Sequence, residues 1–220
     1  MGSGNIRKTG FEINMGKENL YMVNLGAFRA ELERRGFKTS YFDTAGQASD
    51  YLDQALDGRT IGFGGSQTVR DMGLYERLAL HNTCIWHWDK ERNMIPKDAT
   101  DAQVYICSLN GVAETGELVN IDGGGNRLAS GLFGHEKVYF IIGVNKIAPD
   151  LEGAIWRARN IAGPKNARRL EKKTPCAVRG DKCYDCKSPE RICRALVVLW
   201  ERPTGIGRAE VVLVNEPLGY

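Results

Sequence analysis

Apolar residues gather in short runs along this chain, and the runs alternate with segments in which apolar positions recur three or four residues apart. Val138–Gly143 reads Val-Tyr-Phe-Ile-Ile-Gly, which is typical of a strand buried on both faces of a sheet. The pattern predicts further strands at Lys38–Phe42, Thr60–Gly64, Cys84–Trp86, Val104–Cys107, Glu117–Ile121, Leu196–Trp200 and Val211–Val214.

Helical spacing predicts helices between these runs. One covers Asn19–Arg35, a second is capped by Thr44 and ends at Gly58, and a third covers Ser66–Met72. The clearest is expected to close at Gly163-Pro164, and it carries an apolar stripe of Leu151, Ala154, Ile155, Ala158 and Ile161. This alternation predicts an α/β fold: a mostly parallel sheet with helices on both faces, and room for an antiparallel edge near the end of the chain.

Composition favours one folded α/β domain over residues 15–220. Hydrophobic residues make up 42% of the 220, enough for a substantial core, and no repeat or low-complexity linker divides the chain. Residues 1–14 resemble an expression leader or a disordered segment, so we leave them out of the fold prediction. Neither a run of roughly 18 apolar residues nor a secretory signal is present, which predicts a cytoplasmic protein with no membrane partner.

Charge is spread unevenly along the chain. The net charge is only +3, and no nucleic-acid-binding motif accompanies it, so we expect no nucleic-acid partner. Residues 157–194, however, hold twelve Lys or Arg side chains against four acids. Such a segment is either a solvated helix face or a surface that attracts an anionic ligand or an acidic partner.

The turn Gly64-Gly65-Ser66-Gln67-Thr68 leads from a predicted strand into a predicted helix. Glycines allow a sharp turn and a close approach of a ligand, and the free N–H groups at the start of a helix favour negative charge. In open α/β sheets ligands bind beyond the carboxyl ends of the strands, which is where this turn is expected. It is neither a Walker A motif nor a dinucleotide fingerprint. The alternative is a tight turn with an ordinary helix cap.

A second candidate segment runs over Ser108–Asn126. A partly desolvated carboxylate at Glu114 would serve as a general base or a nucleophile. The backbone N–H groups of Gly123, Gly124 and Gly125, with Asn126 beside them, would line a phosphate or oxyanion site. The alternative is a hairpin with a glycine-rich connection and exposed acids.

Four of the six cysteines lie within eighteen residues of each other. In a cytosolic chain such a cluster favours metal or redox chemistry over structural disulfides. A tetrahedral zinc site, an iron-sulfur cluster and a set of reduced, non-ligating thiols all remain open, because the spacing matches no standard ferredoxin or zinc ribbon. The set, in a basic segment that we expect to form an insertion at residues 174–194, is Cys176, Cys183, Cys186 and Cys193.

Together, Gly64-Gly65-Ser66, Glu114-Thr115-Gly116 and the terminal Leu213–Tyr220 resemble the LUD (lactate utilisation) domain family. The resemblance implies a Rossmann-like fold similar to that of the sugar-phosphate isomerase and CoA-transferase superfamily. Glu114-Thr115-Gly116 looks like the Glu-Asn-Gly segment that carries the nucleophilic glutamate of CoA transferases, with Thr115 in place of Asn. Proteins of the LUD family are linked to oxidation of lactate to pyruvate alongside iron-sulfur partner proteins.

These observations predict a cleft formed by Gly64–Thr68, Glu114–Gly116 and Gly123–Asn126. Its ligand is expected to be a small anion: a carboxylate, a phosphate or a CoA-like molecule. Three functions stay open: a component of lactate utilisation or a related redox system, a CoA or acyl transferase or sugar-phosphate isomerase that uses Glu114, and a non-catalytic scaffold that docks an iron-sulfur partner. Self-association into a homo-oligomer stays open as well.

Overall fold

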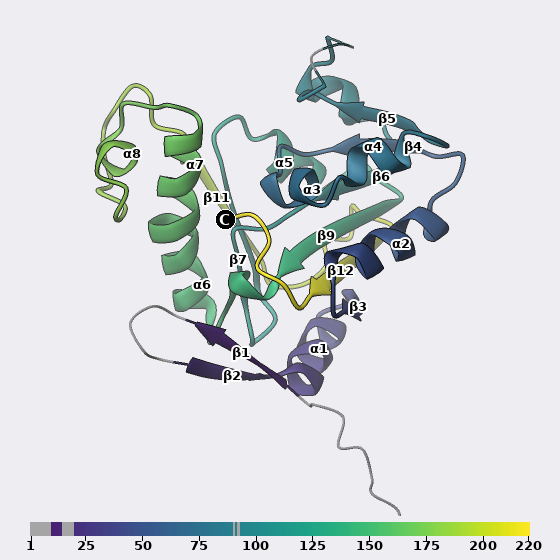
Figure 1. Cartoon of the computed structure of the whole chain (residues 1–220), viewed down its shortest axis with the longest axis horizontal. Helices are drawn as coiled ribbons and strands as arrows, with labels where there is room; N and C mark the ends of the chain where they lie inside the picture. The colour runs from purple at the N-terminus through teal and green to yellow at the C-terminus, as the bar shows by residue number, and fades with distance from the viewer. Residues whose placement is uncertain (1–9, 15–19, 90, 92) are drawn as a thin grey trace, which may run out of the picture.

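The computed structural model describes residues 10–14, 20–89, 91 and 93–220, and its centre is a six-stranded sheet (Figure 1). The strand order is β3-β12-β9-β6-β4-β5, and every neighbouring pair is parallel. The mostly parallel α/β sheet expected from the sequence is therefore confirmed. The strands are β3 Lys38–Phe42, β4 Thr60–Phe63, β5 Thr83–Trp86, β6 Val104–Cys107, β9 Lys137–Gly143 and β12 Arg208–Val214.

The sequence suggested an antiparallel edge strand near the end of the chain, but the last strand is not at an edge of this sheet. β12 lies between β3 and β9, parallel to both. Its residues are buried alternately on the two faces: Val211 and Leu213 join one core cluster, and Val212 and Val214 join the other. A strand that is apolar on both faces gains more from a central position than from an edge.

Antiparallel pairing occurs instead in two smaller sheets. The first has the order β10-β7-β8-β11, in which β8 pairs antiparallel with both β7 and β11. The second is the hairpin of β1 and β2. Their bounds are β1 Gly10–Asn14, β2 Leu20–Asn24, β7 Gly111–Ala113, β8 Leu118–Asp122, β10 Ile147–Ala148 and β11 Ala195–Leu199.

Helices cover the central sheet on one face, and a helix with the four-stranded sheet covers the other. The core cluster of the first face draws on α2, α3 and α4, and that of the second on α1, β7, β8 and β11. No helix among the described residues is long and apolar enough to cross a membrane. The helices are α1 Leu25–Arg34, α2 Ala45–Ala55, α3 Gln67–Asp71, α4 Leu74–Leu78, α5 Asn126–Ser130, α6 Leu151–Arg157, α7 Gly163–Arg169 and α8 Pro175–Arg179, with 3₁₀ turns at Pro96–Ala99 and Val144–Lys146.

Two N-terminal elements differ from the prediction. Gly10–Asn14, set aside with the leader, forms β1, whereas residues 1–9 lie outside the described residues. The helix expected from Asn19 begins only at Leu25, because the side chain of Asn24 accepts a hydrogen bond from the Ala27 N–H group and caps the helix there. The partner of β2 is β1, which lies in the segment set aside, so the pairing could not be predicted.

The helix expected to end at Gly163-Pro164 instead continues to Arg169. Between α6 and α7 the chain takes one π-helical segment, Ala158–Ala162, and the N–H group of Gly163 bonds to the carbonyl of Ala158, five residues back. Proline normally breaks a helix, since it lacks an N–H group and its ring collides with the carbonyl four residues earlier. The widened turn relieves both conflicts. Bulges of this kind often lie at functional sites.

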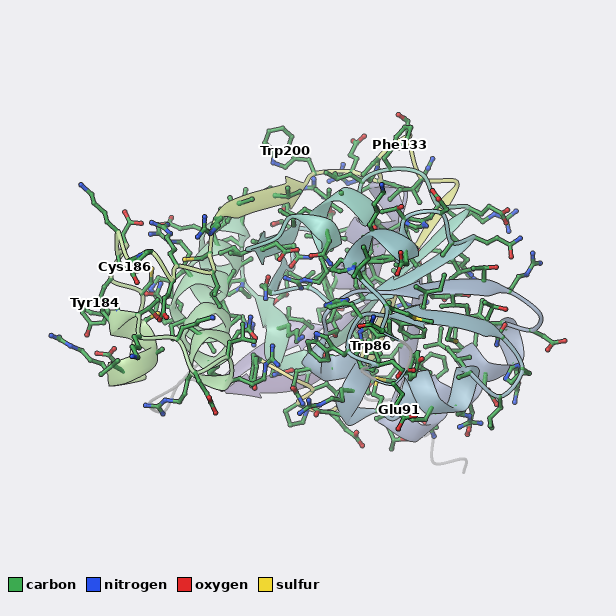
Figure 2. All side chains as sticks on the ribbon, turned by 90° about the horizontal axis from the view of Figure 1, so that it is seen from above. Trp86, Glu91, Phe133, Tyr184, Cys186 and Trp200 are labelled. Carbon is green, nitrogen blue, oxygen red and sulfur yellow. The ribbon has the colours of Figure 1, made fainter. Side chains whose placement is uncertain are left out.

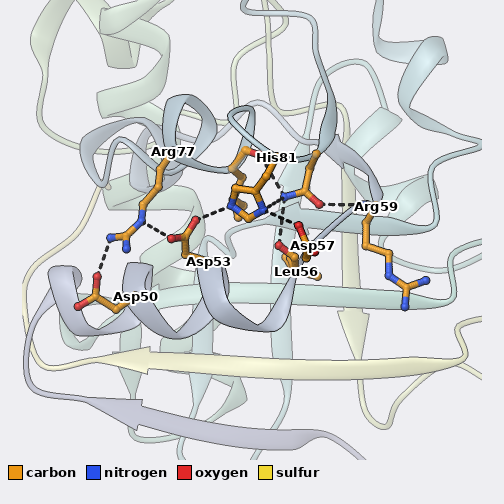
Figure 3. Close-up of polar contacts among 9 residues, drawn as sticks. Asp50, Asp53, Leu56, Asp57, Arg59, Arg77 and His81 are labelled. Atoms are coloured by element: carbon orange, nitrogen blue, oxygen red, sulfur yellow. Dashed lines mark hydrogen bonds and ion pairs between the residues drawn. The ribbon is translucent and has the colours of Figure 1, made fainter.

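A polar network joins α2 to the end of α4 (Figure 3). The His81 ring contacts the carboxylates of Asp53 at 2.8 Å and Asp57 at 3.2 Å, and Arg77 bridges Asp53 and Asp50. The hydrogen bond that the His81 ring donates to the Asp53 carboxylate raises the pKa of His81, and this effect outweighs the opposing effect of burial. The network therefore stabilises the protonated imidazole in the folded state.

We expect this pairing to make stability depend on pH near neutrality. A raised folded-state pKa gives stabilisation that is fully present below the unfolded value, about 6.5, and is lost as the pH rises through the folded value. The melting temperature of the parent should fall across that window more than that of His81→Gln. Parallel slopes for the two proteins in a melting series would contradict this assignment.

Candidate functional site

A cavity of about 580 Å³ opens at the carboxyl ends of four neighbouring strands. Ser66 follows β4, His87 follows β5, Ser108 follows β6 and Lys146 comes after β9, and all four side chains line the cavity. Parallel strands end at the same edge of a sheet, so residues that are far apart in sequence meet here. In Figure 1 this region lies between α7 and the pair α3 and α5, where the C-terminus is also marked.

The structure brings together two of the three segments expected to form the cleft. Gly65–Thr68 and the residues Gly123, Gly124 and Asn126 all line the cavity. Gly64 and Gly125 are adjacent to these segments but do not line it. The third segment, Glu114–Gly116, lies elsewhere.

The turn after β4 is held by its own contacts. The Ser66 hydroxyl accepts a hydrogen bond from the Val69 N–H group and caps α3. This helix has only five residues, so its dipole is a smaller source of positive potential than the sequence had suggested. Attraction of an anion must therefore come mainly from basic side chains around the cavity.

Lys146 lies at the floor of the cavity and is 3% exposed. Its Nζ donates hydrogen bonds to Thr68 Oγ1 and Ser108 Oγ, each at 2.7 Å. Burial lowers the pKa of Lys146 well below its usual range, and the positive charges of Arg157 and Arg127 lower it further. Both effects favour the uncharged amine over the ammonium form.

Arg127 and Arg157 donate hydrogen bonds to backbone carbonyl groups of the loops around this lysine. Arg127 donates to the carbonyls of Ile121, at 2.6 Å, and Ser108, at 3.3 Å. Arg157 Nε donates to Asn145 O at 2.6 Å, and burial lowers the pKa of Arg157 to about 10. Both side chains thus tie loops of the carboxyl edge to one another.

Arg169 of α7 forms the opposite wall. Its guanidinium lies 4.8 Å from the centre of the Trp88 ring, a cation–π arrangement that joins α7 to the segment after β5. Arg70 lies 5.7 Å from the centre of the same ring. Among the described residues, six basic side chains and two acids line the cavity: Arg127, Lys146, Arg169, Lys172, Arg191 and Arg194, with Asp122 and Glu190.

Two polar atoms of the cavity wall are buried without a hydrogen-bond partner in the described part of the chain. They are His87 Nδ1 and Gln67 Oε1. Burial lowers the pKa of His87, which favours the neutral ring at neutral pH. Buried polar atoms are usually paired, so the two offer hydrogen-bonding capacity to a ligand.

Glu114 lies in the turn between β7 and β8, outside the cavity lining. The adjacent Thr115 carbonyl accepts a hydrogen bond from Arg35 Nε at 2.7 Å, and Glu117 pairs with Arg35 at 2.6 Å. A Cβ on Gly116 would lie 2.7 Å from Arg35 Cδ. This turn is therefore packed against the end of α1, and its contacts with Arg35 stabilise the fold.

The four clustered cysteines are not gathered into one site. Cys193 lines the cavity, whereas Figure 2 places Cys186 at the outer end of the molecule beside Tyr184. Cys176 contacts the Thr174 hydroxyl, and the Cys183 sulfur accepts a hydrogen bond from the Asp185 N–H group. Across the described residues, no group of three or more His, Cys, Asp or Glu side chains is placed to hold a metal ion, and a metal site at the four cysteines stays a prediction.

Several cavity residues escaped the sequence analysis: Lys146, Arg127, Arg169, His87 and Trp88. A signal for two of them was present. His87 and Lys146 follow predicted strands within three residues, as Ser66 does, and such positions gather at one edge of a parallel sheet. Arg169 belongs to the basic segment of residues 157–194, but its place in the cavity could not be predicted, because the predicted helix ended at Gly163.

Comparisons with known proteins agree on the fold. The model of the LUD domain matches residues 25–214. The crystal structure of a DUF162 family protein from Deinococcus radiodurans is similar to this chain with a TM-score of 0.52 at 13% sequence identity, and the match covers 86% of this chain and 95% of that one. No curated protein sequence matches the chain.

Proposed function

Because the chain belongs to the LUD domain family, we propose that it is a component of lactate utilisation or a related redox system that binds a small carboxylate in the cavity beside Gly65–Thr68. The observation that carries this proposal is the gathering of basic side chains around a cavity at the carboxyl edge of the sheet. Hydrogen-bonding groups from Thr68 and Ser108 add polarity at its floor.

A carboxylate suits this site for electrostatic reasons. Arg127 and Arg169 both line the cavity, and arginine is the residue best suited to bind a carboxylate by parallel hydrogen bonds. A bound carboxylate would compete for N–H groups that Arg127 donates to Ile121 and Ser108 and that Arg169 donates to Asn166. A cavity of about 580 Å³ has room for a small acid and for a larger anion such as a phosphate ester. The basic segment expected from the sequence contributes Arg169, Lys172, Arg191 and Arg194 to this lining.

The alternatives receive less support from the geometry. Transferase or isomerase chemistry through Glu114 needs this carboxylate at the bound ligand, yet Glu114 lies outside the cavity lining. Docking of an iron-sulfur partner by the basic cysteine-containing segment stays a prediction that no contact among the described residues favours.

Isothermal titration calorimetry with lactate, pyruvate, inorganic phosphate and coenzyme A tests the proposal. We expect saturable heat with at least one of the two carboxylates and weakening at high salt, since salt screens charge–charge attraction. Binding of coenzyme A or phosphate alone would replace the carboxylate with a phosphate ligand. Absence of heat with all four would contradict an anion site.

Arg169→Gln should weaken carboxylate binding by about tenfold, equivalent to about 1.4 kcal/mol, because a charged hydrogen-bond donor is lost. Lys165→Gln is the matched control: it removes one positive charge from the exposed side of α7, away from the cavity lining. Equal effects of the two substitutions in calorimetry would indicate a general charge effect and no direct contact.

A further inference from the structure

We propose that Lys146 is the amine that attacks the carbonyl carbon of a 2-oxo acid held in this cavity and forms an imine with it. The inference rests on the proposed function, since the basic side chains of the cavity are what hold the carboxylate of such a ligand. It adds a substrate class and a covalent step to that function.

The hydrogen bonds of Lys146 leave its lone pair available. An uncharged amine has two N–H bonds, and the two hydroxyls of Thr68 and Ser108 accept both, at 2.7 Å each. An ammonium group would carry a third N–H bond, and among the described residues no carboxylate pairs with Nζ to stabilise the charge. The positive charges of Arg157 and Arg127 disfavour it further, and the opposite effects of Cys107 and Asp71 are smaller.

Burial of this kind makes a lysine a nucleophile. A surface lysine is protonated at neutral pH, because its pKa is about 10.4, and its lone pair is then occupied by a proton. Desolvation together with a nearby cation removes that proton, which is how lysines that form imines are activated. Lys146 has both features and opens onto a cavity large enough for a small acid.

The covalent step balances with the groups present. The lone pair of Nζ forms a bond to the carbonyl carbon, the π electrons of the carbonyl move to its oxygen, and a proton passes from the nitrogen to that oxygen. The remaining N–H proton then passes to this hydroxyl, the oxygen leaves as water, and the nitrogen lone pair forms the C=N bond of the imine. The hydroxyls of Thr68 and Ser108 contact Nζ and can each accept one proton and donate another, so they provide the relay.

A 2-oxo acid matches the two halves of the site. Its carboxylate can bind the arginine side chains that line the cavity. The carbonyl carbon is bonded directly to this carboxylate, so the bound acid brings an electrophilic carbon to Lys146. A 2-hydroxy acid lacks the carbonyl and is expected to bind without forming a covalent bond.

Reductive trapping tests the proposal. The protein is incubated at pH 6 with pyruvate and sodium cyanoborohydride, and the modified residue is identified by mass spectrometry of peptides. At this pH ordinary lysines are protonated, so we expect a single adduct, at Lys146, with at least tenfold less modification elsewhere. Lactate in place of pyruvate should give no adduct. Lys146→Met should lose the adduct, and Lys165→Met should keep it.

Failure of this inference is distinguishable from failure of the proposed function. Saturable calorimetric binding of pyruvate without an adduct at Lys146 in the parent protein would overturn the covalent step and leave the anion site standing. Modification of many lysines with no preference for Lys146 would overturn it too. Absence of binding by lactate and pyruvate would contradict the proposed function itself. Peptide mapping of the parent settles the site even where Lys146→Met does not fold.

Discussion

Lys137→Met is expected to destabilise the protein by about 3 kcal/mol, because it leaves a buried carboxylate without its main counterion. Glu210 is fully buried in β12, 3.1 Å from Lys137 Nζ, and accepts a hydrogen bond from the Tyr51 hydroxyl at 2.7 Å. Burial alone would raise the pKa of Glu210, but Tyr51 and Lys137 outweigh it and hold the pKa below its usual value. Chemical denaturation at neutral pH measures the loss.

Lys38→Met is the matched control for this prediction. Lys38 lies 3.6 Å from the same carboxylate, but its side chain is 66% exposed, so its removal should cost less than about 1 kcal/mol. Glu210 contributes stability above its ordinary pKa, and that contribution is lost as the pH falls through the lowered folded-state value. Equal losses of unfolding free energy in Lys137→Met and Lys38→Met would contradict a stronger pairing of Glu210 with the less exposed lysine.

Gly64→Ala is expected to destabilise the protein by about 1–3 kcal/mol and to weaken carboxylate binding with it, because the new methyl group collides with the cavity wall. A Cβ at this position would lie 2.7 Å from Arg127 Cγ, 2.8 Å from the Tyr105 hydroxyl and 3.0 Å from Cys107 Cβ. Relief requires Arg127 to move away from the carbonyls of Ser108 and Ile121. Thermal melts and calorimetry on one preparation measure both effects.

Gly26→Ala provides the comparison for a glycine without such crowding. It lies in α1, where the closest atom to an added Cβ is Asn24 Oδ1 at an ordinary 3.5 Å. Alanine favours a helix over glycine by roughly 0.5–1 kcal/mol, so this variant should be neutral or slightly more stable. A Gly64→Ala protein as stable as Gly26→Ala would contradict the packing described around the turn.

The central sheet could be predicted from sequence because its strands are apolar on both faces. Val138–Gly143 and Val104–Cys107 leave no polar face for solvent, so their burial in a parallel sheet follows directly. The placement of β12 at the centre could not be predicted, since strand order depends on contacts between segments far apart in the chain. The strand β2 was missed for a different reason: its partner β1 lay in a segment set aside.

The candidate site was predictable where a local turn forms it. The turn Gly64–Thr68 carries its own signal in two glycines and a capping serine, and its residues Gly65–Thr68 line the cavity. Glu114 was placed in the cleft by resemblance to a transferase motif, and the fold instead packs its turn against Arg35. The chemistry proposed for Lys146 depends on its burial, and the local sequence Val144–Lys146 does not reveal that burial.

A crystal structure of the protein with oxamate, an unreactive analogue of pyruvate, tests the anion site most directly. We expect oxamate in the cavity between Gly65–Thr68 and α7, with its carboxylate in contact with at least one of Arg127, Arg169 and Lys146. Oxamate bound beside Glu114 at saturating concentration, and absent from this cavity, would show that the anion site lies elsewhere.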